Sequence, residues 1–563
     1  MNQYLERSKQ VGVLRLTAVT NIVEDTLQKL GDLITPAERV AVCAYGPAVF
    51  AKPGIARGQD LLVLCEGYSN GLRAHLRIYD GEEFRFLIAD RTLVESDLEK
   101  GTLGDYLTEQ FLYPYQPILN IEYLDKIAEK AKTRVAEEEA KDLVIEFREM
   151  CRGMVATPEF FGLSRMRKLA RVSVPSMTAY LRLLEEPVRH RNLMALRSSY
   201  RSAIAATEGE ILRVEGEHVS LEDSAVDRWM KDRVSEQMVN VLRQSQRAFY
   251  SYLSKGRAIY LNPDLLAREL YSPLKLTLDT ELNWISPEDP KNYLYLKTSA
   301  GLVPLGEKAS LDEVIANLKL GGPITITPLA GVLNEVFLVT AGKKQLVVKK
   351  FTDWHGFKWF TLNLVSLGSK LFSVSGKARM TNEYGINRYL GKRGLNVPNI
   401  VYLSVRQRIL VEEYLSGPSF ADLVKEAVDQ SNLSKTQFEI AESLGETLAD
   451  IHHTGVSVGD TKPENFVVND GKVFVVDLEQ AGKRKDFAWD IAELLFYIGH
   501  YRISPTFTGG LKGIIEAIVT GYSHKGDRAE LRKAAAVRYA KAFSVWAPAP
   551  VILEISRILR EAR

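Results

Sequence analysis

The sequence predicts an α+β protein of several domains, and three observations carry this prediction. The chain has 563 residues, whereas one compact domain usually holds about 100–200. Helix-like and strand-like patterns alternate along the whole chain. A Gly321-Gly-Pro323 run, typical of a linker, precedes a region that begins with strands and continues with helices. The predicted parts are residues 1–130, 131–315 and 316–563.

The first part has the pattern of a small α/β domain. A helix-like stretch around Leu27 leads into it, and the predicted strands are 39–45, 60–65 and 83–90. The middle part is mainly helical to about residue 205, after which Glu210–Leu221 predicts a hairpin that turns at Gly216. Because helices flank this hairpin, we expect a winged-helix-like module in the middle part.

Composition and charge set limits on the function. Hydrophobic residues make up 46% and charged residues 26%, as in ordinary globular proteins. The net charge of +2 implies no nucleic-acid or membrane partner by itself. Cys43, Cys65 and Cys151 lie far apart without CxxC spacing, which disfavours a disulfide framework or a zinc site. The N-terminus is polar and no apolar run reaches about 18 residues, so we expect a cytoplasmic protein without a membrane span.

Two turns of the third part are expected to face a nucleotide. Residues 324–339 have a strand-turn-strand pattern, and a small turn with Gly331 and Asn334 can present backbone N–H groups to phosphates. A later strand runs into a hinge-like segment, where Glu413 and Leu415 are candidate nucleotide contacts. A single glycine is weak support, because any hairpin can contain one.

A lysine inside an apolar strand is the next candidate. Lys349 and Lys350 end a run of apolar residues, and a buried lysine requires a partner such as phosphate or a carboxylate. The predicted carboxylate is Glu383, on a helical stretch 34 residues later. Since strand residues alternate in direction, Lys349 shares a face with Val347, the predicted adenine contact. A pair of edge-strand lysines that face water remains the alternative.

Four further residues have the spacing that phosphoryl transfer requires. This chemistry needs a group that orients the acceptor hydroxyl and oxygen ligands for a metal on the triphosphate. A D-x-K-P-x-N motif supplies Asp460 as the orienting base, Lys462 as a phosphate contact and Asn465 as a metal ligand. Asp477 ends an apolar strand 12 residues later, where a second hard oxygen ligand for Mg²⁺ is expected.

Residues 320–500 resemble the protein-kinase-like superfamily, in which these elements occur in the same order. The similarity is greatest to atypical members, namely the small kinase of the archaeal KEOPS tRNA-modification complex, the RIO kinases and the lipopolysaccharide-core sugar kinases. The stretches Ser375–Glu383 and Leu390–Pro398 are similar to the last two groups. The turn at Asn334 is also similar to that of aminoglycoside and choline phosphotransferases. The resemblance implies a two-lobed fold that binds ATP and Mg²⁺.

The motifs also depart from those of ordinary protein kinases. Val458-Gly459 stands where His-Arg usually precedes the catalytic aspartate, and Glu479 replaces the glycine of the DFG motif. Only 12 residues separate Asp477 from Asp490, which resembles a structural aspartate of a later helix. This spacing leaves no room for an activation segment, and there is no APE motif, so a regulated Ser/Thr kinase is disfavoured. We expect His452, ahead of the loop, to serve packing.

Residues 20–125 resemble a degraded nucleotidyltransferase. Members of that family carry a Gly-Ser turn after one strand and an Asp-x-Asp pair on the next, which hold triphosphate and two metals. Here Pro47 replaces the serine after Gly46, and Gly58 replaces the first aspartate, while Asp60 remains. Asp90 is expected near the third carboxylate position. The resemblance implies a domain that has lost nucleotidyl transfer, and an unrelated α/β domain is the alternative.

A basic cluster occupies the middle part. Tyr180 and Tyr200 are interleaved with the cations, and cationic density with stacking groups favours RNA binding. A solvated helical face, or pairing with Glu185 and Glu186, is the alternative. The cationic residues are Arg165, Arg167, Lys168, Arg171, Arg182, Arg189, His190, Arg191, Arg197 and Arg201.

These observations favour ATP- and Mg²⁺-dependent phosphoryl transfer to an unidentified hydroxyl, or ATP hydrolysis coupled to a conformational change. Two other functions stay open. One is a regulatory or scaffolding protein of RNA metabolism that uses both nucleotide folds for binding. The other is a nucleotidyltransferase that the kinase-like domain regulates.

Overall fold

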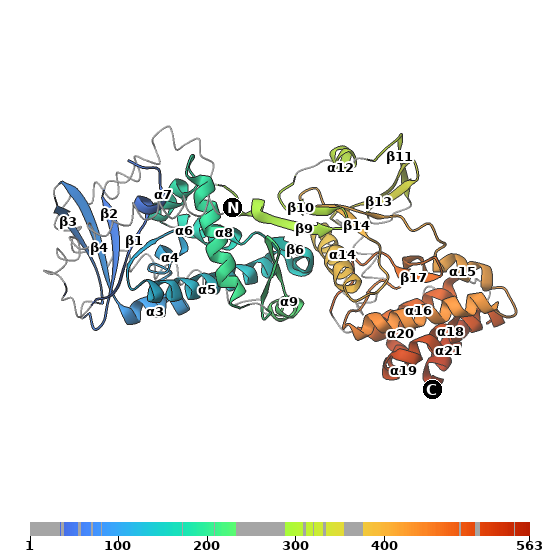
Figure 1. The fold of residues 1–563 in the computed structure, drawn as a ribbon. Coiled ribbons are helices and arrows are strands. Elements are labelled where there is room, and N and C mark those ends of the chain that lie inside the picture. The colour runs from blue at the N-terminus through green and yellow to red at the C-terminus, as the bar shows by residue number, and fades with distance from the viewer. Residues whose placement is uncertain are drawn as a thin grey trace, which may run out of the picture. The chain divides into compact units, whose positions relative to one another are not determined.

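The computed structural model describes residues 34, 39–54, 58–68, 71–79, 81–171, 173–207, 209–231, 288–307, 311–318, 320–329, 334–353, 375–483, 486–501, 507–544 and 547–562. The helix expected around Leu27 and the turn residue Gly331 lie outside these residues. The chain divides into two compact units (Figure 1). Unit 1 comprises the residues up to Asp142 and Ala156–Tyr293, and unit 2 comprises Leu143–Val155 and the residues from Leu294. The fold is a mixed α+β arrangement with several sheets, and the three-part division remains a prediction.

Unit 1 contains a five-stranded sheet of order β3-β4-β2-β1-β5. The predicted strands are confirmed as β1, β2 and β4, where apolar residues fill both faces of the sheet. β2 and β4 run parallel, and the other neighbours are antiparallel. The strands are β1 (Arg39–Tyr45), β2 (Gln59–Cys65), β3 (Leu72–Tyr79), β4 (Glu82–Asp90) and β5 (Gln116–Leu119). The helices of this region are α2 (Pro47–Phe50), α3 (Arg91–Lys100), α4 (Glu109–Leu112) and α5 (Ile121–Phe147), which continues into unit 2.

Helices and one hairpin form the rest of unit 1. The predicted hairpin is confirmed, since β7 and β8 pair antiparallel around Gly216, whose φ of 60° suits glycine. The winged-helix interpretation of this region remains a prediction. The elements are α6 (Glu159–Ala170), α7 (Val174–Leu183), α8 (Arg189–Ala205), β7 (Leu212–Glu215), β8 (His218–Leu221), α9 (Asp223–Trp229) and the 3-10 helix η4 (Pro290–Tyr293).

Unit 2 contains an antiparallel sheet of order β11-β12-β13-β15-β14. Its apolar core includes Val339, Leu346, Val348 and Val411. A long helix, α14 (Gly376–Gly391), is the next described element after the third of these strands in the chain. The strands are β11 (Ile324–Leu329), β12 (Glu335–Ala341), β13 (Lys344–Lys350), β14 (Ile400–Ser404) and β15 (Ile409–Glu413). The elements ahead of them are β9 (Leu294–Thr298), β10 (Gly301–Pro304) and α12 (Leu311–Asn317).

A segment from far upstream packs on α14. Residues 143–155, which we call the strap, include the 3-10 helix η3 (Arg148–Gly153) and the start of β6 (Met154–Ala156). Tyr384 Oη lies 3.0 Å from the carbonyl oxygen of Gly153, and Lys392 Nζ donates to that of Arg152 at 2.9 Å. A Cβ added to Gly385 would lie 2.2 Å from the carbonyl oxygen of Glu149. The strap and α14 are therefore in backbone contact, which only glycine at this helix position permits.

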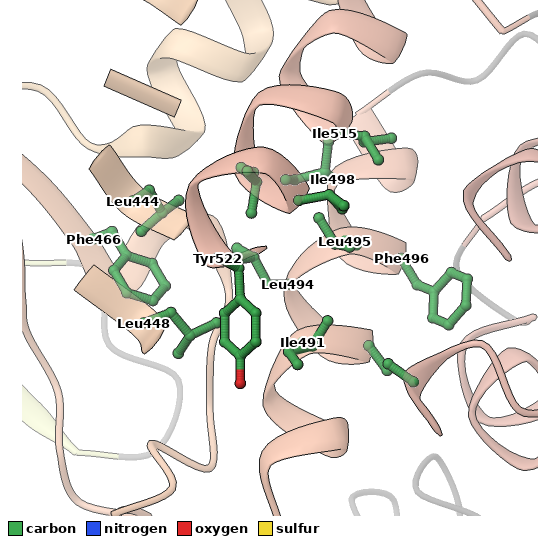
Figure 2. Close-up of a cluster of buried hydrophobic side chains, with 14 of the residues drawn as sticks. Leu444, Leu448, Phe466, Ile491, Leu494, Leu495, Phe496, Ile498, Ile515 and Tyr522 are labelled. Carbon is green, nitrogen blue, oxygen red and sulfur yellow. The ribbon is translucent and has the colours of Figure 1, made fainter. Parts of the chain in front are cut away.

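The remainder of unit 2 is mainly helical. Glycine residues allow α16 and α18 to approach closely. A Cβ on Gly445 or Gly521 would lie about 2 Å from a carbonyl oxygen of the other helix. Figure 2 shows the core that these helices enclose with α17, including Leu444, Leu494 and Tyr522. The elements are α15 (Phe420–Ala427), α16 (Lys435–His453), β16 (Phe466–Asn469), β17 (Lys472–Val475), α17 (Phe487–Ile498), α18 (Gly509–Lys525), α19 (Arg528–Ala534), α20 (Val537–Phe543), α21 (Ala549–Glu561) and the short 3-10 helices η5 (Pro463–Asn465) and η6 (Gly499–Tyr501). Within the described residues, no helix combines the length and the apolar character needed to cross a membrane.

Candidate active site

Lys349 lies in a buried ion-pair network on β13. Its Nζ is 2.9 Å from Glu383 Oε1 and 2.9 Å from Glu412 Oε1, and only 10% of its side chain is exposed. These carboxylates offset the cost of burying an ammonium and keep the pKa of Lys349 well above its usual value. Lys350, one position on, instead pairs with Glu335 at 3.0 Å in a half-exposed bridge. The alternation of the strand thus directs one lysine inward and the next outward.

Glu412 is a site residue that the sequence reasoning missed. Lys349 pairs with Leu410 across the two strands, so Glu412, two residues further, points from the same face. A carboxylate among the apolar residues of β15 was the available signal. Glu412, Glu383 and Asp477 thus place three acidic groups around one buried lysine. Burial, with this negative surrounding, raises the pKa of Glu383 to about 8 despite its pairing with Lys349.

The D-x-K-P-x-N residues form one compact loop between α16 and β16. Lys462 Nζ lies 3.0 Å from Asp460 Oδ1. The amide nitrogen of Asn465 donates to the backbone oxygen of Asp460 at 2.9 Å, so its amide oxygen is left for another partner. The carboxylate of Asp490 holds the loop from α17, because it accepts from the backbone N–H groups of Val458 at 2.6 Å and Gly459 at 2.9 Å.

His452 has the packing position that was expected of it. Its ring is buried against Phe487, with Nδ1 2.8 Å from Tyr522 Oη and Nε2 3.2 Å from Asp490 Oδ2. Both nitrogens are therefore engaged with residues of the helical core. His452 supports the loop through Asp490 and does not face the reacting groups.

Asp477 stands two residues after the end of β17 and interacts with the charges of both Lys349 and Lys462. Its φ of 62° is in the left-handed region, which is unusual for a residue with a side chain and is common at functional positions. Burial raises the pKa of the Asp477 carboxyl, while the nearby charges of Lys349 and Lys462 lower it. Asp460 contributes a like charge close by. The structure thus brings the predicted residues Lys349, Asp460, Lys462 and Asp477 to one place.

The side-chain oxygens of this site are suited to bind a divalent cation together with phosphate. Glu383 Oε2 and Glu412 Oε2 are buried and receive no hydrogen bond from the described residues. The acidic groups outnumber the cations that face them, which favours a positive ligand. Among the described residues, however, no three His, Cys, Asp or Glu side chains gather as a complete metal site. Asp477 and the amide oxygen of Asn465 would therefore share the cation with phosphate oxygens.

The predicted nucleotide contacts at the two turns have partners within the protein. Both ends of the Asn334 amide are engaged, with Nδ2 donating to Glu479 at 2.7 Å and Oδ1 accepting from Arg379 at 2.6 Å. Glu413 Oε1 accepts from the backbone and side-chain nitrogens of Asn399 at 2.8 and 3.0 Å. Val347 and Leu415 are half-buried. Among these, Val347 points from the same face of β13 as Lys349 and so borders the site.

Comparison with known proteins gives one partial match. No protein-family profile matches the chain. A stretch of 101 residues, 18% of the chain, is 26% identical to the KEOPS complex subunit Bud32 of Pyrococcus abyssi. The chain contains a kinase-like region. The match spans 44% of the length of Bud32, so its activity and partners do not pass to this chain by similarity alone.

The residues proposed for a second nucleotide site in unit 1 are arranged differently from the prediction. Tyr45 and Asp60 are partners across β1 and β2, so the turn at Gly46 does lie beside Asp60. Asp90, however, pairs with Cys65 at the opposite end of β2, where it caps α3. The expectation that it stands near the third carboxylate position was wrong, because the parallel register could not be read from the sequence.

Arg85 occupies the place next to Asp60. It is the cross-strand partner of Asp60 on β4, and its Nε lies 2.7 Å from Asp60 Oδ1. Gly58, with φ of 84°, would place a Cβ only 2.1 Å from the carbonyl oxygen of Glu83. A carboxylate at position 58 would clash with this backbone, and an arginine already neutralises Asp60. These contacts disfavour a two-metal site at Asp60.

Most of the basic cluster is neutralised by acidic residues from other segments. Tyr180 and Tyr200 are buried, so they cannot stack on bases. Arg165 is buried as well, and three carboxylates surround it. Ion pairs therefore engage most cations of the predicted RNA-binding face at 165–201, and RNA binding by this region stays a prediction. The pairs are Arg165 with Asp105, Glu138 and Glu139, Arg167 with Asp289, Lys168 with Glu139 and Asp142, Arg182 with Glu185, Arg189 with Glu288, Arg197 with Glu159, and Arg201 with Glu217.

Proposed function

We propose that unit 2 binds ATP with Mg²⁺ and transfers the γ-phosphoryl group to a hydroxyl, either of an acceptor still to be identified or of water. The observation that carries the proposal is the convergence of Lys349, Asp460 and Asp477, which come from three separate segments of the chain. A partial match to a kinase subunit supports the same reading. Phosphoryl transfer depends mainly on position and charge, which this arrangement supplies.

Each side chain has a role that its contacts favour. Asp460 accepts a hydrogen bond from the acceptor hydroxyl and takes its proton as the new P–O bond forms and the bond to the β-phosphate oxygen breaks. Lys462, beside Asp460, stabilises charge on the transferred group. Lys349 contacts the phosphates from β13, held in direction by Glu383 and Glu412. Asp477 and Asn465 would hold Mg²⁺, which neutralises charge on the triphosphate.

The segment after Asp477 favours an acceptor other than a docked peptide. Gly482 pairs with Ser457 through two backbone hydrogen bonds of 2.9 and 3.0 Å, immediately ahead of the catalytic loop. The chain then reaches α17, which carries Asp490, within a few residues. The backbone that presents peptides in ordinary protein kinases therefore has no counterpart here. We therefore expect the acceptor hydroxyl to belong to a folded macromolecule or to a small molecule, which need no such backbone to be positioned.

The test is incubation of the full chain with Mg²⁺, cell extract and γ-labelled ATP, with label and free phosphate both followed. Wild type should label an acceptor or release phosphate, whereas Asp460→Asn should lose this activity and still bind ATP. A parallel reaction with α-labelled ATP should leave every acceptor unlabelled. Equal turnover by Asp460→Asn and wild type would refute the assignment.

A further inference from the structure

A second buried ion pair in unit 2 has no role in the proposed reaction. Arg379 Nη1 lies 2.9 Å from Glu479 Oε2, and the arginine side chain is fully buried. Arg379 is on α14, one helical turn before Glu383, and Glu479 stands two residues after Asp477. A buried pair of this kind does little for stability by itself, since desolvation offsets much of the attraction. Its place between α14 and the metal-binding loop suggests another purpose.

The pair also connects two strands of the sheet. Asn334, ahead of β12, donates to Glu479 Oε2 at 2.7 Å and accepts from Arg379 at 2.6 Å. The other terminal nitrogen of Arg379 donates to the backbone oxygen of Thr352, just after β13. The amide of Asn382, on the next turn of α14, donates to the backbone oxygen of Glu479 at 3.1 Å. Four chain segments thus meet at one carboxylate and one guanidinium.

The spacing on α14 couples this network to Lys349. Residues four apart lie on one face of a helix, so Arg379 and Glu383 point in the same direction. Glu383 reaches Lys349 while Arg379 reaches Glu479. A rotation or shift of α14 would break both pairs together. The backbone N–H of Glu479 also donates to Asp477, so the same movement would disturb the predicted metal ligand.

We propose that Arg379, Glu479 and Asn334 form a positioning network that holds α14 and Asp477 in the arrangement required for phosphoryl transfer. The proposal rests on the proposed function and extends it to how the site is assembled. Ordinary protein kinases use a phosphorylated activation segment for this purpose, and the short segment after Asp477 leaves no room for one. The site is therefore assembled by the fold itself, and Asn334 acts by fixing the turn ahead of β12.

The experiment compares Arg379→Met, Glu479→Gln and Asn334→Ala with wild type in γ-label transfer or phosphate release by the full chain. A displacement of about 1 Å in a phosphoryl-transfer site can cost about a hundredfold in rate. We expect kcat to fall about a hundredfold in Arg379→Met and less in Glu479→Gln, because glutamine still accepts a hydrogen bond. The affinity for ATP should change much less than kcat. A purely structural role would lower the fraction of folded protein without this split.

Lys350→Ala is the matched control, since it removes a half-exposed ion pair from the same sheet and lies outside the network. Thermal unfolding of every variant identifies any that fail to fold. If Arg379→Met unfolds, Asn334→Ala still tests the network, because the Asn334 variant keeps the Arg379–Glu479 pair in place. Variants that fold and turn over at the wild-type rate would overturn the network. Absence of transfer and hydrolysis in wild type itself would instead overturn the proposed function.

Discussion

Replacing Lys349 with methionine tests the buried charge arrangement independently of any acceptor. The change leaves Glu383 and Glu412 without the cation that both contact at 2.9 Å. Breaking a buried ion pair by removing one partner typically costs about 3–5 kcal/mol. Glu383, with a pKa of about 8, is already largely protonated at pH 7, so the cost falls mainly on Glu412. Protonation sets an upper limit for this carboxylate, because neutralising a carboxyl with an unfolded pKa of about 4.3 at pH 7 costs about 3.7 kcal/mol. We therefore expect Lys349→Met to lower the free energy of unfolding by about 3 kcal/mol at pH 7.

The pH dependence has a definite sign. A carboxyl whose pKa is raised in the folded state favours folding fully below its unfolded pKa, and this contribution is lost as pH rises through the folded value. The pKa of Glu383 is already raised to about 8 by burial, and loss of Lys349 raises it further. Up to about pH 8 wild type and variant lose the contribution of Glu383 at the same rate, so the deficit of the variant relative to wild type should stay nearly constant below that pH and grow above it.

Chemical denaturation of the full chain at pH 7, 8 and 9 measures these differences, with Lys350→Met as the matched control. The bridge between Lys350 and Glu335 is about half exposed on both sides, so its loss should cost less than about 1 kcal/mol. Adding Glu412→Gln to Lys349→Met should recover part of the stability, because it removes one uncompensated charge. A larger effect at position 350 than at 349, or a deficit that shrinks with pH, would refute the inward placement of Lys349.

Three further outcomes are expected. Asp477→Asn should weaken the binding of Mg²⁺-ATP, measured by calorimetry, by about tenfold or more. Asp460→Asn should leave this affinity nearly unchanged, since Asp460 faces the acceptor. The reverse order of the two affinities would exchange the roles of these residues. Gly385→Ala should lower both the melting temperature and turnover, because the new Cβ would lie 2.2 Å from a strap carbonyl, although alanine favours helix by about 1 kcal/mol. Gly391→Ala, whose nearest neighbour would be a methyl group at 3.4 Å, is its control, and equal behaviour would argue against the strap contact. The full chain should incorporate no α-labelled nucleotide, because Arg85 neutralises Asp60; incorporation that Asp60→Ala abolishes would restore the nucleotidyltransferase hypothesis.

The features that could be predicted from the sequence are those with a local signal. The strands around Val42, Val63 and Val347 show continuous or alternating apolar residues, and the structure has strands there. β3 was missed although a local signal was present, because its apolar residues alternate with arginine and histidine as expected for a half-buried strand. In the same way, the strict spacing of D-x-K-P-x-N allowed its residues to be identified together, because the contacts of this loop join residues no more than five positions apart.

The features that could not be predicted depend on partners distant in sequence. Arg379 and Glu479 are separated by 100 residues, and no local sequence pattern around either residue predicts their contact. The partners of the basic cluster were missed for the same reason, since Arg165 pairs with Asp105, which lies 60 residues away in the sequence. Asp90 was misplaced because strand register decides which end of a sheet a residue occupies.

The strap has a consequence for the order in which the chain can fold during synthesis. It leaves the ribosome before all of 156–293 and well before α14, against which Tyr384 and Gly385 fit it. Because a domain cannot close until its last packing element exists, the strap must remain without its partner helix while the second segment of unit 1 is synthesised. The entropic cost of bringing the two pieces together rises only slowly with the length between them. An expression fragment that starts at residue 294 would lack this piece and expose the face of α14 that it covers.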